Sequence, residues 1–201
     1  SMKTSVILAH PYEQSFNAAI AAAVVKTLDE CGHTVLFHDL CREHFDPVIP
    51  KEELVGDQTN DPLVQLHQEE IQTADGIVII HPNWWGQPPA VLKGWVDRVL
   101  RENVAYAFPA GDSGGGLPIG LLHAKKGLVF NTSNTSAARE NDVFGDPLQR
   151  LWRDCIFGFC GVTEFDRVMF RIVADSSADE RDAWLRETAD RTQRSFQIGR
   201  A

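Results

Sequence analysis

Short, uninterrupted runs of apolar residues recur along this chain, and they restrict its possible folds more than any other feature. The runs at 5–9, 76–80 and 127–130 contain no polar side chain after their first residue. Such runs are typical of strands buried on both faces of a parallel sheet, because a strand with one face in water alternates polar and apolar residues. Longer segments of helical composition separate the runs. This alternation predicts an α/β fold.

The segments between the apolar runs contain helix signals. The segment at 17–28 is rich in alanine, the best helix former, and 90–100 places its apolar residues on one helical face. Asp61 followed by Pro62 is typical of a helix start. We therefore predict helices at 17–28, 61–73, 90–100, 147–159 and 178–196, further strands at 33–38 and within 162–172, and a polar loop at 45–59.

The alternation also predicts how the strands are arranged. Five strands separated by helices form a parallel sheet covered on both faces and joined by right-handed crossovers. A chain of 201 residues suits the flavodoxin-like strand order 2-1-3-4-5. Sheets of this order bind ligands beyond the carboxyl ends of their strands, at the switch point between the first and third strands. We expect one domain, 1–201, with its chemistry in the loops after the first, third and fourth strands.

Composition excludes several classes of protein. The formal net charge of −9 disfavours attachment to nucleic acid through phosphate contacts and binding to an anionic membrane surface. No apolar run approaches the ~18 residues that a membrane span needs, and the chain does not begin with a charged-then-apolar leader. We expect a cytoplasmic protein with no nucleic-acid partner and no membrane insertion.

Cysteine and histidine residues form no recognised metal pattern. The four cysteines do not make a disulfide scaffold in a chain of this length. Cys155 and Cys160 lie in an apolar stretch and are predicted to be buried thiols. His38, Cys41 and His44 match no structural zinc spacing, so we expect a solvated passage from strand to loop and no metal.

The loop after the first strand, which contains His10, Ser15, Phe16 and Asn17, runs directly into a helix. A helix start favours a phosphate because its N–H groups are unpaired and its dipole is positive there. Ser15 and Asn17 either cap the helix or donate to phosphate oxygens, and the sequence leaves both roles open. No G-x-G-x-x-G follows this strand and no G-K-[ST] occurs, so neither a Rossmann dinucleotide site nor a P-loop is expected.

The loop after the third strand holds two adjacent tryptophans between prolines, within 82–89. Aromatic residues usually serve the core. A pair in a rigid loop at the functional edge of the sheet favours a planar ligand or a partner subunit for at least one of them. The alternative is that both tryptophans pack against the following helix.

Two blocks of sequence resemble a known family. The first is Ala9-His10-Pro11 with Ser15-Phe16-Asn17, and the second is Pro82-x-Trp-Trp with P-A-V-L-K-G-W-V-D-R-V at 89–99. Both resemble the NAD(P)H:quinone reductase (DT-diaphorase) family, with matches that extend to about Ser133. The resemblance implies a flavodoxin-like homodimer that binds a flavin, usually FAD and in some members FMN. It also implies reduction of quinone-like acceptors by NAD(P)H.

The resemblance assigns roles to individual residues. On the pyrophosphate and adenosine side of the cofactor it places His10, Ser15, Phe16 and Asn17. Beside the isoalloxazine ring it places Pro82, Asn83, Trp84, Trp85 and Gly86, and near the pyrimidine end Thr132 and Ser133. Asn134, which stands where the family usually has glycine, is a further cofactor-binding candidate. Tyr106 and Phe108 fall in a segment that lines the substrate pocket from the partner subunit.

The chain departs from the family pattern at two places that bear on function. Gly86-Gln87 stands where the family commonly has Phe-Gly, which enlarges or reshapes the pocket over the flavin. Arg139-Glu140 aligns with a tyrosine of mammalian-type members. Arg139 is therefore the candidate catalytic residue, stabilising a reduced, anionic flavin electrostatically. The alternative is an exposed surface arginine.

The function that the resemblance implies is a two-step, ping-pong hydride transfer. NAD(P)H delivers hydride to the flavin and leaves, and a quinone or related electron-poor aromatic then takes two electrons. One alternative is a flavin-binding regulatory subunit of an ion-efflux system, with redox activity secondary. Another is a binding module that has lost its cofactor, which the presence of Ser15 and Asn17 disfavours.

Overall fold

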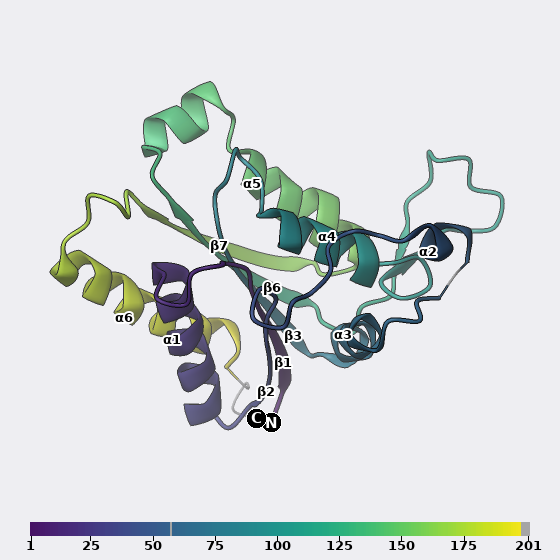
Figure 1. Cartoon of the computed structure of the whole chain (residues 1–201), viewed down its shortest axis with the longest axis horizontal. Helices are drawn as coiled ribbons and strands as arrows, with labels where there is room; N and C mark the ends of the chain where they lie inside the picture. Colours follow the sequence, from purple (N-terminus) through teal and green to yellow (C-terminus); the bar gives the residue numbers. More distant parts are fainter. Residues whose placement is uncertain (57, 198–201) are drawn as a thin grey trace.

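Strands and helices alternate along the chain as the sequence predicts. The structure, a computed structural model, describes residues 1–56 and 58–197. Two of the helical segments, Arg139–Val143 (η1) and Leu151–Gly158 (η2), are π-helical. The elements in Figure 1 are β1 (Lys3–Leu8), α1 (Phe16–Glu30), β2 (Thr34–Asp39), α2 (Lys51–Val55), α3 (Pro62–Thr73), β3 (Gly76–Pro82), α4 (Ala90–Val99), β4 (Tyr106–Ala107), β5 (Ile119–Gly120), β6 (Lys126–Ser133), η1 (Arg139–Val143), α5 (Pro147–Arg150), η2 (Leu151–Gly158), β7 (Glu164–Arg171) and α6 (Ala178–Ser195).

The main sheet has five parallel strands in the order β2-β1-β3-β6-β7. This order is 2-1-3-4-5 when only these strands are counted, which confirms the flavodoxin-like prediction. Every residue of β3 is buried because the strand lies in the middle of the sheet, whereas the edge strand β2 is partly exposed. The switch point between β1 and β3 brings the loops that follow them to the same edge.

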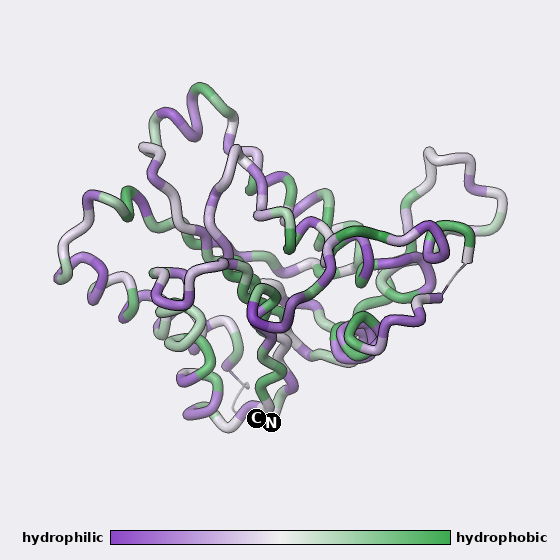
Figure 2. Tube along the Cα trace, in the orientation of Figure 1, coloured by the Kyte–Doolittle hydropathy of each residue, from purple (hydrophilic) through white to green (hydrophobic). Residues whose placement is uncertain are grey.

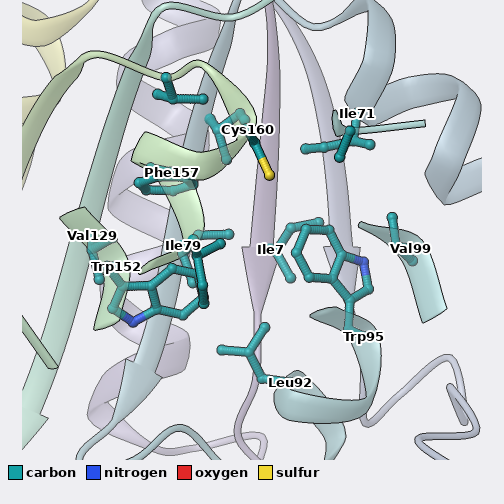
Figure 3. Packing of buried hydrophobic residues seen from close by; sticks show 14 of the residues in the cluster. Ile7, Ile71, Ile79, Leu92, Trp95, Val99, Val129, Trp152, Phe157 and Cys160 are labelled. Carbon is teal, nitrogen blue, oxygen red and sulfur yellow. The ribbon is translucent and has the colours of Figure 1, made fainter. Parts of the chain in front are cut away.

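Helices cover both faces of the sheet. In Figure 1, α1 and α6 lie on one face, and α3, α4 and α5 lie on the other. Alternate residues along each strand point to opposite faces, so Val6 and Val78 pack with α1 while Ile7 and Ile79 belong to the second core. Figure 2 shows the apolar residues gathered along the strands, and Figure 3 shows Trp95 and Trp152 on either side of the Ile7–Ile79 pair.

Side-chain caps fix where the longer helices begin. The Oγ of Ser15 accepts a hydrogen bond from the N–H of Ala18 at 3.1 Å, and α1 starts at the next residue. Asp61 accepts from the N–H groups of Leu63 and Val64 at the start of α3, as its position before a proline predicts. These contacts are local in sequence, which is why the boundaries could be predicted.

The structure differs from the sequence prediction in several places. The segment predicted as a polar loop contains α2, and a small antiparallel pair, β4 and β5, lies in the connection before β6. The predicted helix at 147–159 widens into π-helical turns after its first turn. Cys160 is buried but Cys155 is exposed, because Trp152 and Ile156 occupy the side of η2 that faces the core. Within the described residues, no helix combines the length and the apolar character that crossing a bilayer requires.

Candidate functional site

The loop after β3 forms a two-residue turn that exposes a tryptophan. Trp84 and Gln87 exchange both backbone hydrogen bonds at 3.0 Å. The two residues between them have positive φ angles, 59° at Trp85 and 67° at Gly86, as in a type I′ turn. A bulky residue rarely adopts this conformation, and the side chain of Trp85 is 99% exposed. Strain of this kind, with no packing to offset it, is typical of functional sites.

Asn83 ties this turn to the rest of the edge. Its backbone N–H donates to the carbonyl of Thr132 at 2.7 Å, and its Oδ1 accepts from the N–H of Gly86 at 2.9 Å. Its Nδ2 donates to Oε2 of Glu140 at 3.0 Å. The three contacts fix the orientation of the Asn83 amide and join the loop after β3 to the segment after β6.

A cavity of about 540 Å³ lies between these two segments. The loop after β3 contributes Asn83, Trp85 and Gly86, and the segment after β6 contributes Thr135, Arg139, Glu140, Phe144 and Pro147. The cavity lies at the carboxyl edge of the sheet, where folds of this type bind their ligands. Its wall therefore combines two aromatic side chains with polar and charged groups that could orient a small molecule.

The loop after β1 contributes a second hollow, of about 330 Å³, beside Ser15 and Phe16. Its other wall belongs to α6, with Arg181 and Asp182. Ser15 caps α1. The ring of Phe16 packs against those of Phe170 and Trp184. The sequence of α6 predicts a helix, and nothing in its pattern marks this helix as part of a site.

Asn17 and Thr132 bind each other. Nδ2 of Asn17 donates to Oγ1 of Thr132 at 2.9 Å, and both residues are buried. These side chains join the start of α1 to the end of β6. Ser133 Oγ accepts from the N–H of Thr135, and Oδ1 of Asn134 accepts from the N–H of Ala174, 40 residues further along the chain. Both side chains act as acceptors in these contacts, so the Ser133 hydroxyl and the Asn134 Nδ2 keep donors that this end of β6 can offer to a ligand.

The remaining predicted residues lie in different surroundings. His10 approaches Trp84, with ring centroids 6.0 Å apart, and burial lowers the pKa of its imidazole. Pro82 ends β3 and is buried. Arg139 is exposed and lines the cavity, which is compatible both with a role in stabilising a reduced flavin and with an ordinary surface arginine. Tyr106 and Phe108 do not line the cavity; their rings pack with each other and with Phe159.

A residue that sequence reasoning did not place in the site is Glu140. It is only 1% exposed and lines the cavity beside Asn83. The segment R-E-N-D-V at 139–143 reads locally as a solvated run, and the partner Asn83 is 57 residues away. The local pattern therefore contained nothing that distinguished Glu140 from its exposed neighbours.

A buried hydrogen-bond network around His81 holds the carboxyl end of β3 in place. His81 is completely buried, and burial lowers its pKa to about 4. Its Nδ1 lies 2.7 Å from the carbonyl of Pro82, and its Nε2 lies 2.9 Å from Nε1 of Trp152 and 3.0 Å from Nδ2 of Asn131. Because the indole and amide groups are donors, Nε2 is the acceptor and Nδ1 carries the proton. His81 therefore holds the strand end from which the tryptophan turn emerges.

The predicted solvated passage around His38 is wrong. His38 is buried between two carboxylates, 2.5 Å from Glu43 and 2.6 Å from Glu70, because α3 packs over the end of β2. Burial by itself would lower the pKa of His38, but these hydrogen bonds outweigh it and raise the pKa above its usual value. Burial also opposes ionisation of Glu43, yet hydrogen bonds from His38 and His67 lower its pKa to about 2.

Three of these groups are close enough to hold a cation: His38, Glu43 and His67. The indole Nε1 of Trp95 lies 2.9 Å from Nδ1 of His67, so that nitrogen accepts and the proton is on Nε2, 3.1 Å from Glu43. Binding a metal through Nε2 would move the proton to Nδ1, facing the indole donor. The chemistry of this contact favours a charged hydrogen-bond cluster over a metal site.

The chain resembles proteins of known sequence along most of its length. A family of proteins with a flavodoxin-like fold matches this chain over residues 2–194. A Haemophilus influenzae protein called an uncharacterized NAD(P)H oxidoreductase is 31% identical over 96% of this chain and 95% of its own. Ribosyldihydronicotinamide dehydrogenase [quinone] of Pongo abelii is 30% identical, with 79% of this chain and 77% of that protein covered.

Solved structures agree with this assignment. The crystal structure of a Streptococcus mutans UA159 protein superposes with a TM-score of 0.84 at 29% identity, covering 96% of this chain and 100% of that one. NAD(P)H:quinone oxidoreductase from Methanothermobacter marburgensis has the same fold, with a TM-score of 0.80 at 23% identity over 98% of this chain and 99% of that one. The strand order, the tryptophan turn and these similarities all indicate the same family. The chain is an oxidoreductase that belongs to the NAD(P)H:quinone oxidoreductase family of flavodoxin-like proteins.

Proposed function

We propose that this protein binds a flavin and transfers reducing equivalents from NAD(P)H to quinones or related electron-poor aromatic compounds. The observation that carries this proposal is the cavity between the tryptophan turn and the segment after β6. It lies at the ligand-binding edge of the sheet, and its wall combines the aromatic Trp85 and Phe144 with polar side chains, among them Arg139 and Glu140. The names of relatives, such as NAD(P)H dehydrogenase [quinone] 1 of Rattus norvegicus, support the choice of donor and acceptor.

The residues around the cavity fit an isoalloxazine ring. Trp85 and Phe144 offer flat apolar surfaces, and Asn83 and Glu140 offer polar groups. Gly86 has no side chain, and a Cβ added there would lie 2.9 Å from Cγ of Pro147. Glycine at this position therefore lets the turn pack closely against Pro147, where both residues line the cavity. When bound, the flavin supplies the hydride chemistry, and the protein supplies position and electrostatics.

The rest of the cofactor site follows from the loop after β1. We assign the hollow beside Ser15 and Phe16 to a pyrophosphate and adenosine, because it lies at the start of α1 and Arg181 adds a cationic side chain to its wall. This second hollow favours FAD, because FMN has no adenosine to fill it. FMN remains the alternative cofactor, and a structural neighbour from Bacillus anthracis is described as an FMN-dependent NADH-azoreductase in complex with FMN.

The proposed reaction consumes one NAD(P)H, one proton and one quinone, and gives one NAD(P)⁺ and one hydroquinone, with two electrons transferred. Donor and acceptor both need access to the same ring, so we propose that they occupy the cavity in turn, with ping-pong kinetics. Arg139 places its positive charge at the cavity and favours negative charge on the bound ring. We also propose a homodimer in which Tyr106 and Phe108 complete the pocket of the partner subunit.

The test is the absorbance spectrum of the purified protein, with the released flavin identified by chromatography. We expect a band near ~450 nm that NAD(P)H bleaches and a quinone restores, and parallel lines in double-reciprocal plots of initial velocity. A colourless protein that takes up neither FAD nor FMN would contradict the proposal. Reduction without useful turnover by any soluble quinone would favour the regulatory alternative.

A further inference from the structure

Glu140 has one carboxylate oxygen that nothing in the described part of the chain satisfies. Oε2 accepts from Nδ2 of Asn83 at 3.0 Å, whereas Oε1 is buried and has no hydrogen-bond partner. The backbone of Glu140 is fixed on both sides, since its N–H donates to the carbonyl of Ser136 and its carbonyl accepts from the N–H of Asp146. The carboxylate is therefore held in place at the wall of the cavity.

Among the described residues, no donor reaches Oε1. The amide of Asn83 is held by its other contacts, because its Oδ1 accepts from the N–H of Gly86 and its Nδ2 donates to Oε2 rather than to Oε1. Arg139 lines the same cavity with an exposed side chain, and none of its donors reaches Oε1. A buried polar atom without a partner costs about 1–3 kcal/mol, and more when it is charged. A donor on the molecule that fills the cavity would remove this cost.

The cavity indicates what kind of donor this is. Trp85 and Phe144 offer flat surfaces to a planar ring, and the carboxylate oxygen Oε1 can only accept, so the ring must carry a hydrogen-bond donor on its edge. The isoalloxazine ring has one such group, the imide N–H of its pyrimidine edge, and FAD and FMN share it. Resting on the function proposed above, we propose that Glu140 positions the flavin by accepting a hydrogen bond from this imide N–H through Oε1.

The substitution Glu140→Gln separates this role from simple support of Asn83. The amide oxygen of the glutamine keeps the hydrogen bond from Asn83, so its NH₂ group takes the place of Oε1. A donor then faces the donor of the ring. We expect the flavin Kd, measured by fluorescence quenching, to rise about tenfold or more, with the melting temperature close to that of the unaltered protein. Asp142→Asn is the matched control, since it removes one exposed carboxylate from η1 away from the cavity, and it should leave the Kd unchanged.

A flavin methylated at the imide nitrogen provides a readout that a purely structural role would not affect. The unaltered protein should bind N3-methyl-FMN about tenfold or more weakly than FMN, because the donor is gone and the methyl group meets the carboxylate. Glu140→Ala should lose most of this discrimination, since neither the acceptor nor the steric conflict remains.

The outcomes distinguish this inference from the proposed function. If the unaltered protein binds neither flavin, the proposed function fails. If it binds flavin but Glu140→Gln binds equally well and both proteins ignore the methyl group, the inference is wrong and the proposed function stands. An unchanged flavin Kd with a raised KM for NAD(P)H would also overturn it, because Oε1 would then recognise the substrate.

Discussion

At the scale of single residues, Trp85 shows the conflict between stability and function most clearly. It adopts a left-handed backbone conformation, which costs an L-residue about 1–2 kcal/mol, and its side chain gains no burial in return. Glycine occupies such positions without that cost. A tryptophan at this position therefore needs a reason outside the isolated fold, and the proposed flavin ring provides one.

The substitution Trp85→Gly should accordingly leave stability unchanged or raise it by up to about 1 kcal/mol, because relief of the backbone strain offsets the greater freedom of the unfolded chain. Flavin affinity should fall in the same variant. Thermal unfolding and flavin titration measure the two effects. Gly86→Ala is the contrasting control: a positive φ and a Cβ only 2.9 Å from Cγ of Pro147 should lower stability. A large loss of stability in Trp85→Gly would disprove this account of the turn.

The residue scale is also where prediction from sequence was weakest. The cap Asp61 could be recognised, and Ser15 could be named as a candidate cap, because each bonds to N–H groups two or three residues away. The side-chain partner of Glu140 lies 57 residues away, and one of the two carboxylates at His38, Glu70, lies 32 residues away, so the burial of both residues depends on how η1 and α3 pack. The hydrophobic periodicity of a sequence gives no information on contacts between residues so far apart. The strands β1, β3 and β6 were predictable because burial on both faces is visible in each strand alone.

At the scale of elements, α3 is held to β2 by the cluster around His38. The folded pKa of His38 is raised, so its contribution to stability is complete below its unfolded value, about 6.5, and is lost as the pH rises through the folded value. The groups that face it are Glu43, Glu70 and the ring of His67, 3.9 Å away. Glu43 has a lowered pKa, so its contribution is present above about pH 4.5 and is lost as the pH falls towards 2.

We therefore expect thermal stability to decline as the pH rises above about 6.5, and His38→Gln to remove most of that decline. The measurement is the melting temperature of both proteins across this range. The variant should also be less stable at pH 6, since two carboxylates lose their cationic partner. His44→Gln replaces an exposed histidine in the turn that follows β2 and should keep the slope of the unaltered protein. An identical slope in His38→Gln would show that His38 is not the titrating group.

The strand end at His81 should respond to acid instead. Its folded pKa of about 4 lies below the unfolded 6.5, so stability is complete above about pH 6.5 and falls by about 3 kcal/mol as the pH drops through 4. His81→Gln should remove this part of the acid dependence, as measured by denaturant unfolding from pH 4 to 7. Trp152→Phe deletes the indole donor but keeps the imidazole, so it should lower stability at neutral pH and retain the acid slope. Equal slopes in all three proteins would exclude His81 as their source.

At the scale of the whole molecule, apolar side chains remain exposed over the connection that contains β4 and β5. Phe108 is 41% exposed, and Leu117 and Ile119 are more exposed still. Exposed apolar groups gathered in one region are typical of interaction surfaces. The proposed homodimer covers this region and brings Tyr106 and Phe108 to the partner's cavity, which the single chain leaves without them.

The substitution Phe108→Glu tests both parts of that proposal. A carboxylate buried at the centre of an interface loses its hydration without gaining a partner, so the dimer should dissociate at micromolar concentration in sedimentation experiments. The kcat/KM for the quinone should fall about tenfold or more, because the pocket loses the wall that the partner provides. Phe37→Glu is a matched control: Phe37 is 43% exposed, on the edge strand β2. It should remain dimeric and active, whereas a dimeric Phe108→Glu with full activity would place the interface elsewhere.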